Sequence, residues 1–369
     1  MCTDILILAG GLGERLWPIS NTRKPKQFMT LSGGETFLQS AIRRALALNI
    51  SGKIYIITRK EWVQLVITDI LNLIERMHES PVPASKFLVM SEPFGKNTAP
   101  AITWLSKYLQ QSSNQAANLL MMASDHIIQP MDAFIADVEK ASCFSDKNNL
   151  VTFSIKPDVP SIGYGYIKTG ESIPDESGKQ NGIFKIESFR EKPDEVTARS
   201  YLKDGRYYWN SGIYAFRTDF YLSELSKKTP EIFNAFSSLE KEYDIECIHG
   251  IQVLTNQAGL YEAYERTPAL SIDYALSEKC SSAVTIRASF SWDDVGTWDS
   301  LTKYPVTDSK KSVLIQSENC YINSDIPVAL CGVEDLIVVI KNGEALVCKK
   351  GKSDLTKDAL ACMKTKTTF

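Results

Sequence analysis

The sequence is poor in the residues that build most metal centres and disulfide frameworks. It has three histidines, none at ligand spacing from another, and eight cysteines without a C-x-x-C pair. Neither a histidine-based metal centre nor a zinc site is therefore expected. Because neither histidines nor cysteines are spaced as ligands, any metal should be bound by oxygen. The scattered cysteines are typical of reduced thiols in the cytoplasm.

Long hydrophobic runs and a strong charge of either sign are also missing. No eighteen apolar residues run together, and the N-terminus has no basic flank before a long apolar segment. Neither a membrane-spanning helix nor an export signal is predicted. With a formal net charge of −3, the chain gives no reason to expect nucleic acid or an acidic membrane as a partner.

From residue 4 to about 155, short apolar runs alternate with amphipathic segments of helix length. We expect strands at 4–9, 53–58, 86–91 and 118–123, and helices near 36–48, 60–77, 97–111 and 131–145. This alternation builds a parallel sheet covered on both faces, so the predicted fold class is α/β. Such sheets bind ligands at the carboxyl ends of their strands, where a glycine-rich turn, Glu92 and Asp125 fall.

The second half of the chain is less regular. Extended segments at 164–169, 183–189 and 212–217 predict an antiparallel extension, and polar residues 171–182 predict an exposed hairpin loop. Short strands are expected at 320–324, 328–333, 335–341 and 344–350, followed by a polar end. We place a domain boundary here, with a catalytic domain at 1–303 and a β-rich appendage at 304–369.

The first expected strand is followed at once by Gly10, Gly11 and Gly13. Without Cβ atoms, glycines let backbone N–H groups approach phosphate oxygens. Four cations follow, and no acidic residue occurs between Arg15 and Gly34; the cations are Arg15, Arg23, Lys24 and Lys26. A G-x-G after a strand is as often only a tight connection, but the added positive charge predicts a site for a nucleoside triphosphate.

The stretch LAGGLGERLWPIS, followed by PKQF, resembles the signature of the sugar-nucleotide pyrophosphorylases, in the variant of the mannose-1-phosphate guanylyltransferases. The resemblance implies a Rossmann-like, mixed but mostly parallel sheet with a small appendage like a β-helix. It also implies that GTP and mannose 1-phosphate are converted to GDP-mannose and diphosphate. In the family, the residues matching Arg15 and Lys26 stabilise the phosphates as diphosphate departs.

The resemblance also implies the nucleotide-binding residues. Segment 92–102, EPFGKNTAPAI, is similar to a family motif beside the guanine base, although Lys96 replaces an arginine and loses its bidentate fork. Taken alone, Asn97 and Thr98 could simply cap a helix. The implied nucleotide-binding residues are Leu8, Ala9, Gly10, Gly11, Gly13, Glu92, Asn97 and Thr98.

Two aspartates are candidates for Mg²⁺ ligands. Asp125 lies in ASDHII and Asp294 in SWDDVGTW; both match family motifs in which the aspartates hold the catalytic metal. Taken alone, such an aspartate is more often a turn or cap residue. Mg²⁺ usually takes one or two carboxylates and fills its shell with phosphates and water. Asp293 is the neighbouring alternative to Asp294, and His126 is given no chemical role.

Further motifs resemble the sugar-phosphate side of the family. GYGYI, EKP, WNSGIY and SIDYAL each have an ordinary structural reading as a strand bend, turn or helix cap. Their occurrence together in family order implies a binding role for Gly165, Glu191, Lys192, Asn210 and Asp273.

Two alternatives to guanylyl transfer remain open. The chain could join another base or sugar by the same chemistry, or it could be a non-catalytic regulator that binds sugar nucleotides. Family analogy implies a homodimer. Some relatives carry an extra isomerase domain beyond residue 369. The sequence stops before such a domain, so a single activity is expected.

Overall fold

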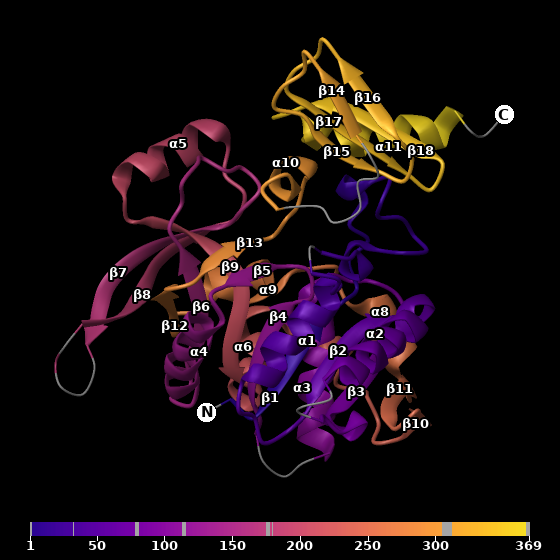
Figure 1. Cartoon of the computed structure of the whole chain (residues 1–369). Coiled ribbons are helices and arrows are strands. Elements are labelled where there is room, and N and C mark those ends of the chain that lie inside the picture. Colours follow the sequence, from indigo (N-terminus) through magenta and orange to yellow (C-terminus); the bar gives the residue numbers. More distant parts are fainter. Residues whose placement is uncertain are drawn as a thin grey trace. The chain divides into compact units, whose positions relative to one another are not determined.

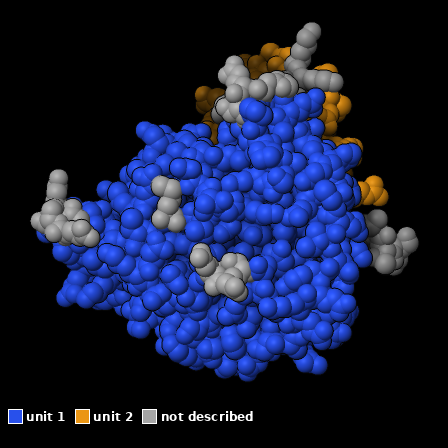
Figure 2. Space-filling model, turned by 90° about the horizontal axis from the view of Figure 1, so that it is seen from below, with its two compact units in different colours: residues 1–10, 42–123, 128–292 blue, residues 11–41, 124–127, 293–369 orange. Residues whose placement is uncertain are grey.

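The computed structural model describes residues 2–31, 33–77, 81–112, 116–174, 178, 180–304 and 312–366. The chain forms two compact units (Figure 2). Unit 1 comprises residues 1–10, 42–123 and 128–292, and unit 2 comprises residues 11–41, 124–127 and 293–369. Unit 2 thus contains the whole predicted appendage together with most of the glycine turn and both candidate metal ligands. The boundary at 303/304 stays a prediction.

Unit 1 is built on a large mixed sheet (Figure 1). Within the described residues its strand order is β10-β11-β3-β2-β1-β4-β9-β6-β12-β8-β7. Most strands run in one direction, and β8, β9 and β10 run against them. The strands are β1 (Asp4–Leu8), β2 (Ile54–Arg59), β3 (Phe87–Glu92), β4 (Asn118–Ala123), β6 (Leu150–Ile155), β7 (Tyr166–Pro174), β8 (Gln180–Arg190), β9 (Tyr207–Arg217), β10 (Tyr243–Ile248), β11 (Ile251–Gln257) and β12 (Ala283–Arg287). The predicted mixed, mostly parallel sheet is confirmed.

The predicted strands and helices of the first half are confirmed to within a few residues. Segment 60–77 is divided into a 3₁₀ turn and a helix. The helices up to residue 275 are α1 (Phe37–Ala47), α2 (Val63–Arg76), α3 (Thr98–Ser112), α4 (Met131–Ser145), α5 (Glu195–Asp204), α6 (Thr218–Lys228), α7 (Pro230–Ala235), α8 (Leu260–Arg266) and α9 (Ile272–Ala275).

Both faces of the sheet are covered. Leu6, Met90 and Tyr214 belong to a buried cluster that α3, α6, α7 and α8 share. The alternate residues of the same strands, such as Ile7 and Val89, are also fully buried, and α2 and α4 contact strands of the sheet. Strands buried on both faces need continuous apolar sequence. For this reason the apolar runs of the first half of the chain allowed its strands to be predicted from the sequence.

Two features of unit 1 differ from expectation. Residues 171–182 were expected to form the exposed loop of a hairpin. The hairpin is present, but strands β7 and β8 extend into this segment, so that its loop is shorter than expected. Residues 175–177 and 179 lie outside the described residues. The hairpin β10–β11, which adds two strands beside β3, was not predicted. Its polar, exposed strand β10 lacks the apolar alternation that marks a half-buried strand.

Unit 2 carries short strands that pair with the next strand but one (Figure 1). Strand β14 (Ser312–Ile315) pairs in parallel with β16 (Val328–Cys331), and β15 (Tyr321–Ser324) with β17 (Leu336–Lys341). Strand β18 (Glu344–Lys349) pairs antiparallel with β17. This pairing is that of the expected appendage. The short strands β5 (Ile127–Gln129) and β13 (Ser291–Asp293) complete the described set.

The expected polar end contains a helix that was not predicted, α11 (Thr356–Lys366). The sequence of α11 has only weak amphipathicity, and Leu360 is its residue packed against the core of unit 2. That core joins Trp17, Phe37, Trp298 of α10 (Trp298–Leu301) and Val339. Tertiary contacts rather than local pattern therefore place this helix. None of the described helices combines the length and apolar character needed to cross a bilayer.

The core beside α3 gives a stability prediction. Trp104 is fully buried, and its Nε1 donates to Gln257 Oε1 at 2.9 Å. We expect Trp104→Ala to lower the free energy of unfolding by about 3–5 kcal/mol, because it leaves a large cavity and an unpaired amide. Urea unfolding followed by circular dichroism measures this change. Val196→Ala, at a side chain 79% exposed, is the control; equal losses in both variants would contradict the prediction.

Candidate functional site

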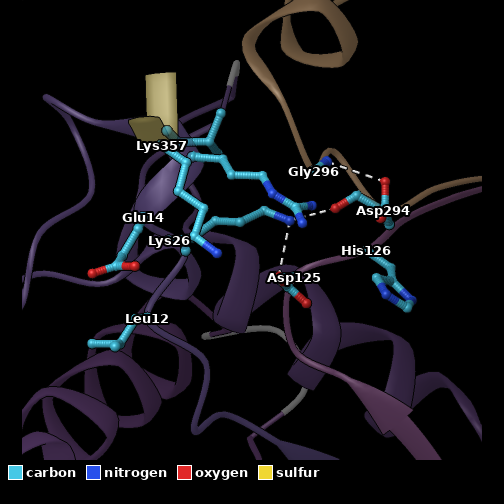
Figure 3. Close-up of a pocket in the computed structure, with 11 residues that line it drawn as sticks. Leu12, Glu14, Lys26, Asp125, His126, Asp294, Gly296 and Lys357 are labelled. Carbon is cyan, nitrogen blue, oxygen red and sulfur yellow. Dashed lines mark hydrogen bonds and ion pairs between the residues drawn. The ribbon is translucent and has the colours of Figure 1, made fainter. Parts of the chain in front are cut away.

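A cavity of about 330 Å³ lies within unit 2 and gathers residues that are far apart in the sequence (Figure 3). Its lining comes from the glycine turn, from the segment after β4, from the segment after β13 and from α11. The lining residues are Leu12, Gly13, Glu14, Arg15, Leu16, Lys26, Asp125, His126, Asp294, Gly296 and Lys357. Five predicted site residues are thereby brought together.

The glycine turn is shaped to fit around Lys26. Gly13 has a φ of 66°, and a Cβ at this position would lie 2.5 Å from the Cβ of Lys26. Only glycine meets both demands at low cost. Ser20 Oγ donates to the Gly13 carbonyl at 2.5 Å, and a 3₁₀ turn, Glu14–Leu16, then carries Arg15 to the cavity.

Lys26 is the most constrained cation of the cavity. It is only 4% exposed, and its Nζ donates to Asp125 Oδ2 at 2.9 Å and to the backbone carbonyl of Asp294. The ammonium also lies 5.2 Å from the centroid of the Phe37 ring. A buried ammonium requires such partners because its desolvation is costly. Lys26 therefore ties two distant chain segments to the turn.

The charge of Asp125 is controlled by this contact. Burial raises the pKa of its carboxyl, but the ammonium of Lys26, with a smaller contribution from His126, outweighs burial and holds the pKa below its ordinary value. Asp125 is therefore an anion at neutral pH. It presents carboxylate oxygen to the cavity, and its side chain remains 33% exposed.

The two consecutive aspartates 293 and 294 have different surroundings. Asp293 is buried, accepts the Val295 N–H at 2.7 Å and contacts Tyr304 Oη at 3.3 Å. Asp294 lines the cavity, and its Oδ1 accepts the Gly296 N–H at 3.1 Å. Of the two, Asp294 is the one that can present oxygen to a ligand there.

Unit 1 holds the predicted base-side residues around a buried carboxylate. Glu92 is the last residue of β3, rather than following it, and is 4% exposed. A Cβ on Gly10 would lie 2.6 Å from Glu92 Oε1, so the turn needs glycine here as well. Tyr264 Oη donates to Glu92 Oε2 at 3.3 Å, and Arg59 Nε donates to the Gly10 carbonyl at 3.1 Å.

Burial dominates the acidity of Glu92. Loss of solvent raises the pKa of its carboxyl to about 7, although the Tyr264 hydrogen bond and the charge of Arg59 oppose the rise. Glu92 can therefore change between donor and acceptor near neutral pH. Sequence reasoning missed Arg59 and Tyr264, since no local motif surrounds either residue.

The remaining predicted base-side residues have structural partners in unit 1. Asn97 Oδ1 accepts the Thr98 N–H at 2.9 Å, and Thr98 Oγ1 accepts the Ile272 N–H at 2.8 Å. Lys96 Nζ donates to the Thr267 carbonyl at 3.1 Å. Thr98 thus fixes the start of α9, which carries Asp273.

Leu8 ends the first strand, and Ala9 follows it. The Ala9 N–H donates to the Ile57 carbonyl at 2.8 Å, and the Ala9 carbonyl accepts Thr58 Oγ1 at 2.9 Å. Gly11 is exposed, and a Cβ there would meet nothing within 4 Å. Space for a ligand is therefore left beside Gly11 but not beside Gly10.

The predicted sugar-side residues form a hydrogen-bonded cluster in unit 1. Asn210 Nδ2 donates to Asp273 Oδ1 at 2.8 Å, and Tyr214 Oη donates to the same oxygen at 2.7 Å. Thr152 Oγ1 donates to Asn210 Oδ1 at 2.8 Å, which fixes the amide orientation. Sequence reasoning missed Tyr214 and Thr152, whose hydrogen bonds hold Asp273 and Asn210.

Glu191 lies against Gly165 in the same part of unit 1. Burial raises the pKa of its carboxyl, and the nearby Asp273 raises it further, while the charge of Lys192 opposes both effects. Lys192 Nζ is 3.3 Å from Glu191 Oε1. The five predicted sugar-side residues thus supply two carboxylates, an amide and an ammonium, a set suited to hydroxyl groups and a phosphate.

Comparison with known proteins shows the family to which the chain belongs. The family model described as nucleotidyl transferase matches residues 5–311. The chain is a member of the nucleotidyl transferase family. A mannose-1-phosphate guanylyltransferase of Klebsiella pneumoniae is 34% identical over 97% of this chain and 73% of its own length. A mannose-1-phosphate guanylyltransferase of Salmonella montevideo is 36% identical over 93% of this chain and 70% of its own length.

A solved structure supports the nucleotidyl transferase fold. The mannose-1-phosphate geranyltransferase from Thermus thermophilus matches with a TM-score of 0.80 at 24% identity, covering 99% of this chain and all of that one. The resemblance inferred from the glycine turn and the PKQF segment is confirmed. The roles of single residues stay predictions.

The raised pKa of Glu92 predicts a pH dependence of stability. Its folded pKa of about 7 lies above the ordinary value of 4.5, so its contribution is fully present below pH 4.5 and is lost as pH rises through 7. We expect Glu92→Gln to gain about 2 kcal/mol relative to the wild type between about pH 5 and pH 8. Urea unfolding across this range measures the gain.

A matched control separates burial from charge. Glu231→Gln replaces an exposed carboxyl. Its stability should follow the wild type at every pH. A Glu92→Gln variant that also follows the wild type would contradict the prediction.

Proposed function

We propose that this protein transfers the guanylyl group of GTP to mannose 1-phosphate, releasing diphosphate and forming GDP-mannose. The observation that carries the proposal is the gathering of Arg15, Lys26, Asp125 and Asp294 around one cavity. Relatives named mannose-1-phosphate guanylyltransferase, at about one third identity over most of the chain, support the choice of substrates.

The reaction is a displacement at phosphorus. An oxygen of the sugar phosphate attacks the α-phosphorus of GTP, and a new P–O bond forms. The bond from that phosphorus to the oxygen bridging to the β-phosphate breaks, and diphosphate leaves with the electron pair. Since the attacking phosphate is already ionised, no general base is required. Catalysis consists of positioning two anions and stabilising charge on the leaving group.

The cationic side chains of unit 2 suit the leaving group. In the proposed roles, Arg15 binds phosphate oxygens through its planar fork, and Lys26 places a fixed positive charge at the cavity wall. Because Lys26 is already held by Asp125 and the Asp294 carbonyl, no reorganisation is needed when charge develops.

The donor set also fits a divalent cation. Within the described residues no group of three or more His, Cys, Asp and Glu side chains could hold a metal ion. Mg²⁺ needs only one or two carboxylates when phosphates and water complete its shell. Asp125 and Asp294 would hold it. When bound, it would screen the repulsion between the two phosphate-bearing substrates.

Residues of unit 1 would select the base and the sugar. We assign the base to the group around Glu92, with Leu8, Ala9, Gly10, Asn97 and Thr98. We assign the phosphates to the backbone of Gly11, which is exposed, and of Gly13, which is half-buried. Asp273 and Asn210, fixed by Tyr214, would contact sugar hydroxyls together with Glu191 and Gly165. Lys192 would contact the sugar phosphate.

We also propose that the protein is a cytoplasmic homodimer. None of the eight cysteines forms a disulfide, which is typical of a reducing compartment. The β14 strand exposes Val313, Leu314 and Ile315, apolar surface that a second copy could cover.

Substrate choice is tested by measuring diphosphate release for pairs of nucleoside triphosphates and sugar 1-phosphates. We expect the highest kcat/KM with GTP and mannose 1-phosphate, loss of turnover on chelation of divalent cations, and recovery with Mg²⁺. A faster reaction with another pair would replace the proposed substrates. Binding of GDP-mannose without turnover of any pair would favour a regulatory protein.

The roles of Lys26 and Asp294 are tested by Lys26→Met and Asp294→Asn. Methionine keeps a buried aliphatic stem but removes the charge. We expect kcat to fall by about 10²–10³ in either variant, as for the loss of one charge-stabilising group, with the circular dichroism spectrum retained. Lys227→Met, at a side chain 61% exposed on α6, should keep full activity. Near-normal turnover by Lys26→Met would refute its role.

A further inference from the structure

The cavity of unit 2 receives a lysine from the other end of the sequence. Lys357, the second residue of α11, lines the same cavity as Arg15 and Lys26. In Figure 3 its side chain extends from the helix toward Lys26, while Asp125 and Asp294 lie on the other side of Lys26 in this view. Helix α11 also contacts the 3₁₀ turn that carries Arg15.

The three cations of the cavity differ in how they are used. The charge of Lys26 is taken up by Asp125 and by the Asp294 carbonyl. Among the residues that the structure describes, neither the Arg15 guanidinium nor the Lys357 ammonium has a hydrogen bond or an ion pair. Two cations without protein partners, beside a third that is fixed, leave donors available to a multiply charged anion.

The position of Lys357 is set by a hydrogen-bonded connection rather than by a free loop. Asp299 of α10 accepts the Gly351 N–H at 2.6 Å through Oδ1, and the Ser353 N–H at 3.1 Å through Oδ2. Ser353 Oγ donates to Asp299 Oδ2 at 2.5 Å and accepts the Asp299 N–H at 3.0 Å. Ser353 is fully buried.

This connection links Lys357 to the Asp294 segment. Thr356, the first residue of α11, is 2% exposed, and its Oγ1 donates to the Ser353 carbonyl at 2.8 Å. Helix α10 begins at Trp298, shortly after Asp294. Asp299 therefore fastens the start of α11 to the segment that supplies Asp294, and Lys357 follows directly. A lysine that was only solubilising the surface would need no such anchor.

We infer that Lys357 binds the diphosphate group, as the tail of the nucleoside triphosphate and as the leaving group, and that Asp299 is its positioning residue. The inference rests on the proposed function for the identity of the reaction, but the diphosphate contact can be measured without turnover. A lysine ammonium offers three donors on a flexible stem, which suits an anion whose oxygens move as the P–O bond breaks.

The test uses Lys357→Met and Lys357→Arg in the full chain. Binding of inorganic diphosphate is measured by calorimetry, and the KM values for diphosphate and GDP-mannose are measured in the reverse reaction. We expect Lys357→Met to weaken diphosphate binding and raise its KM roughly tenfold or more, the value of one charged hydrogen bond. The KM for GDP-mannose should stay within about twofold, and Lys357→Arg should restore most of the loss.

Two further variants act as controls. Lys352→Met removes an exposed lysine of the same segment that does not line the cavity, and it should bind diphosphate as the wild type does. Asp299→Asn has one oxygen fewer for the donors of Gly351 and Ser353, and it should weaken diphosphate binding in the same direction as Lys357→Met.

The possible results are distinct. Diphosphate affinity unchanged in Lys357→Met would overturn the inference, whatever the activity. Equal losses in Lys357→Met and Lys352→Met would also overturn it, because they would indicate general surface charge. If the wild type bound diphosphate through Lys357 but turned over no substrate pair, the inference would stand and the proposed function would fail.

Discussion

The buried ammonium of Lys26 is the interaction on which the cavity of unit 2 depends. An amine that is 4% exposed cannot stay charged without partners, because its desolvation costs several kcal/mol. Its partners are the Asp125 carboxylate and the Asp294 carbonyl, which come from widely separated parts of the chain. Satisfying one cation therefore brings together three segments and, with them, both candidate metal ligands.

The charges around Lys26 divide into a fixed set and an available set. Lys26 and Asp125 are tied to each other, while Arg15 and Lys357 line the same cavity and have no hydrogen bond or ion pair with any residue that the structure describes. This division suits a displacement at phosphorus, in which the protein does little covalent chemistry. In the proposed reaction, the fixed pair would define where the anions bind, and the two other cations would stabilise the charge that develops on the leaving group.

In unit 1 two carboxylates are held by neutral tyrosines rather than by a cation. Glu92 and Asp273 each accept a hydrogen bond from a tyrosine, Tyr264 and Tyr214 respectively. Burial, together with the adjacent carboxylate, raises the pKa of both phenols well above the ordinary value. Both tyrosines therefore remain neutral donors, and they orient the acids without adding a charge. Such neutral partners leave a carboxylate able to accept further hydrogen bonds from a base or a sugar hydroxyl.

The sequence by itself determined the class of fold, the family and the local chemistry of the turn. Continuous apolar runs are required of strands buried on both faces, so β1 to β4 could be located, and the glycines with their cations indicated an anion site. Tertiary structure alone decided which residues meet. Helix α11 has too weak an apolar pattern to be predicted, and tertiary contacts, among them the hydrogen bonds of Asp299 just before the helix and the packing of Leu360, bring Lys357 to the cavity. Arg59, Tyr214 and Tyr264 act through contacts between distant segments, and no local pattern records such a contact.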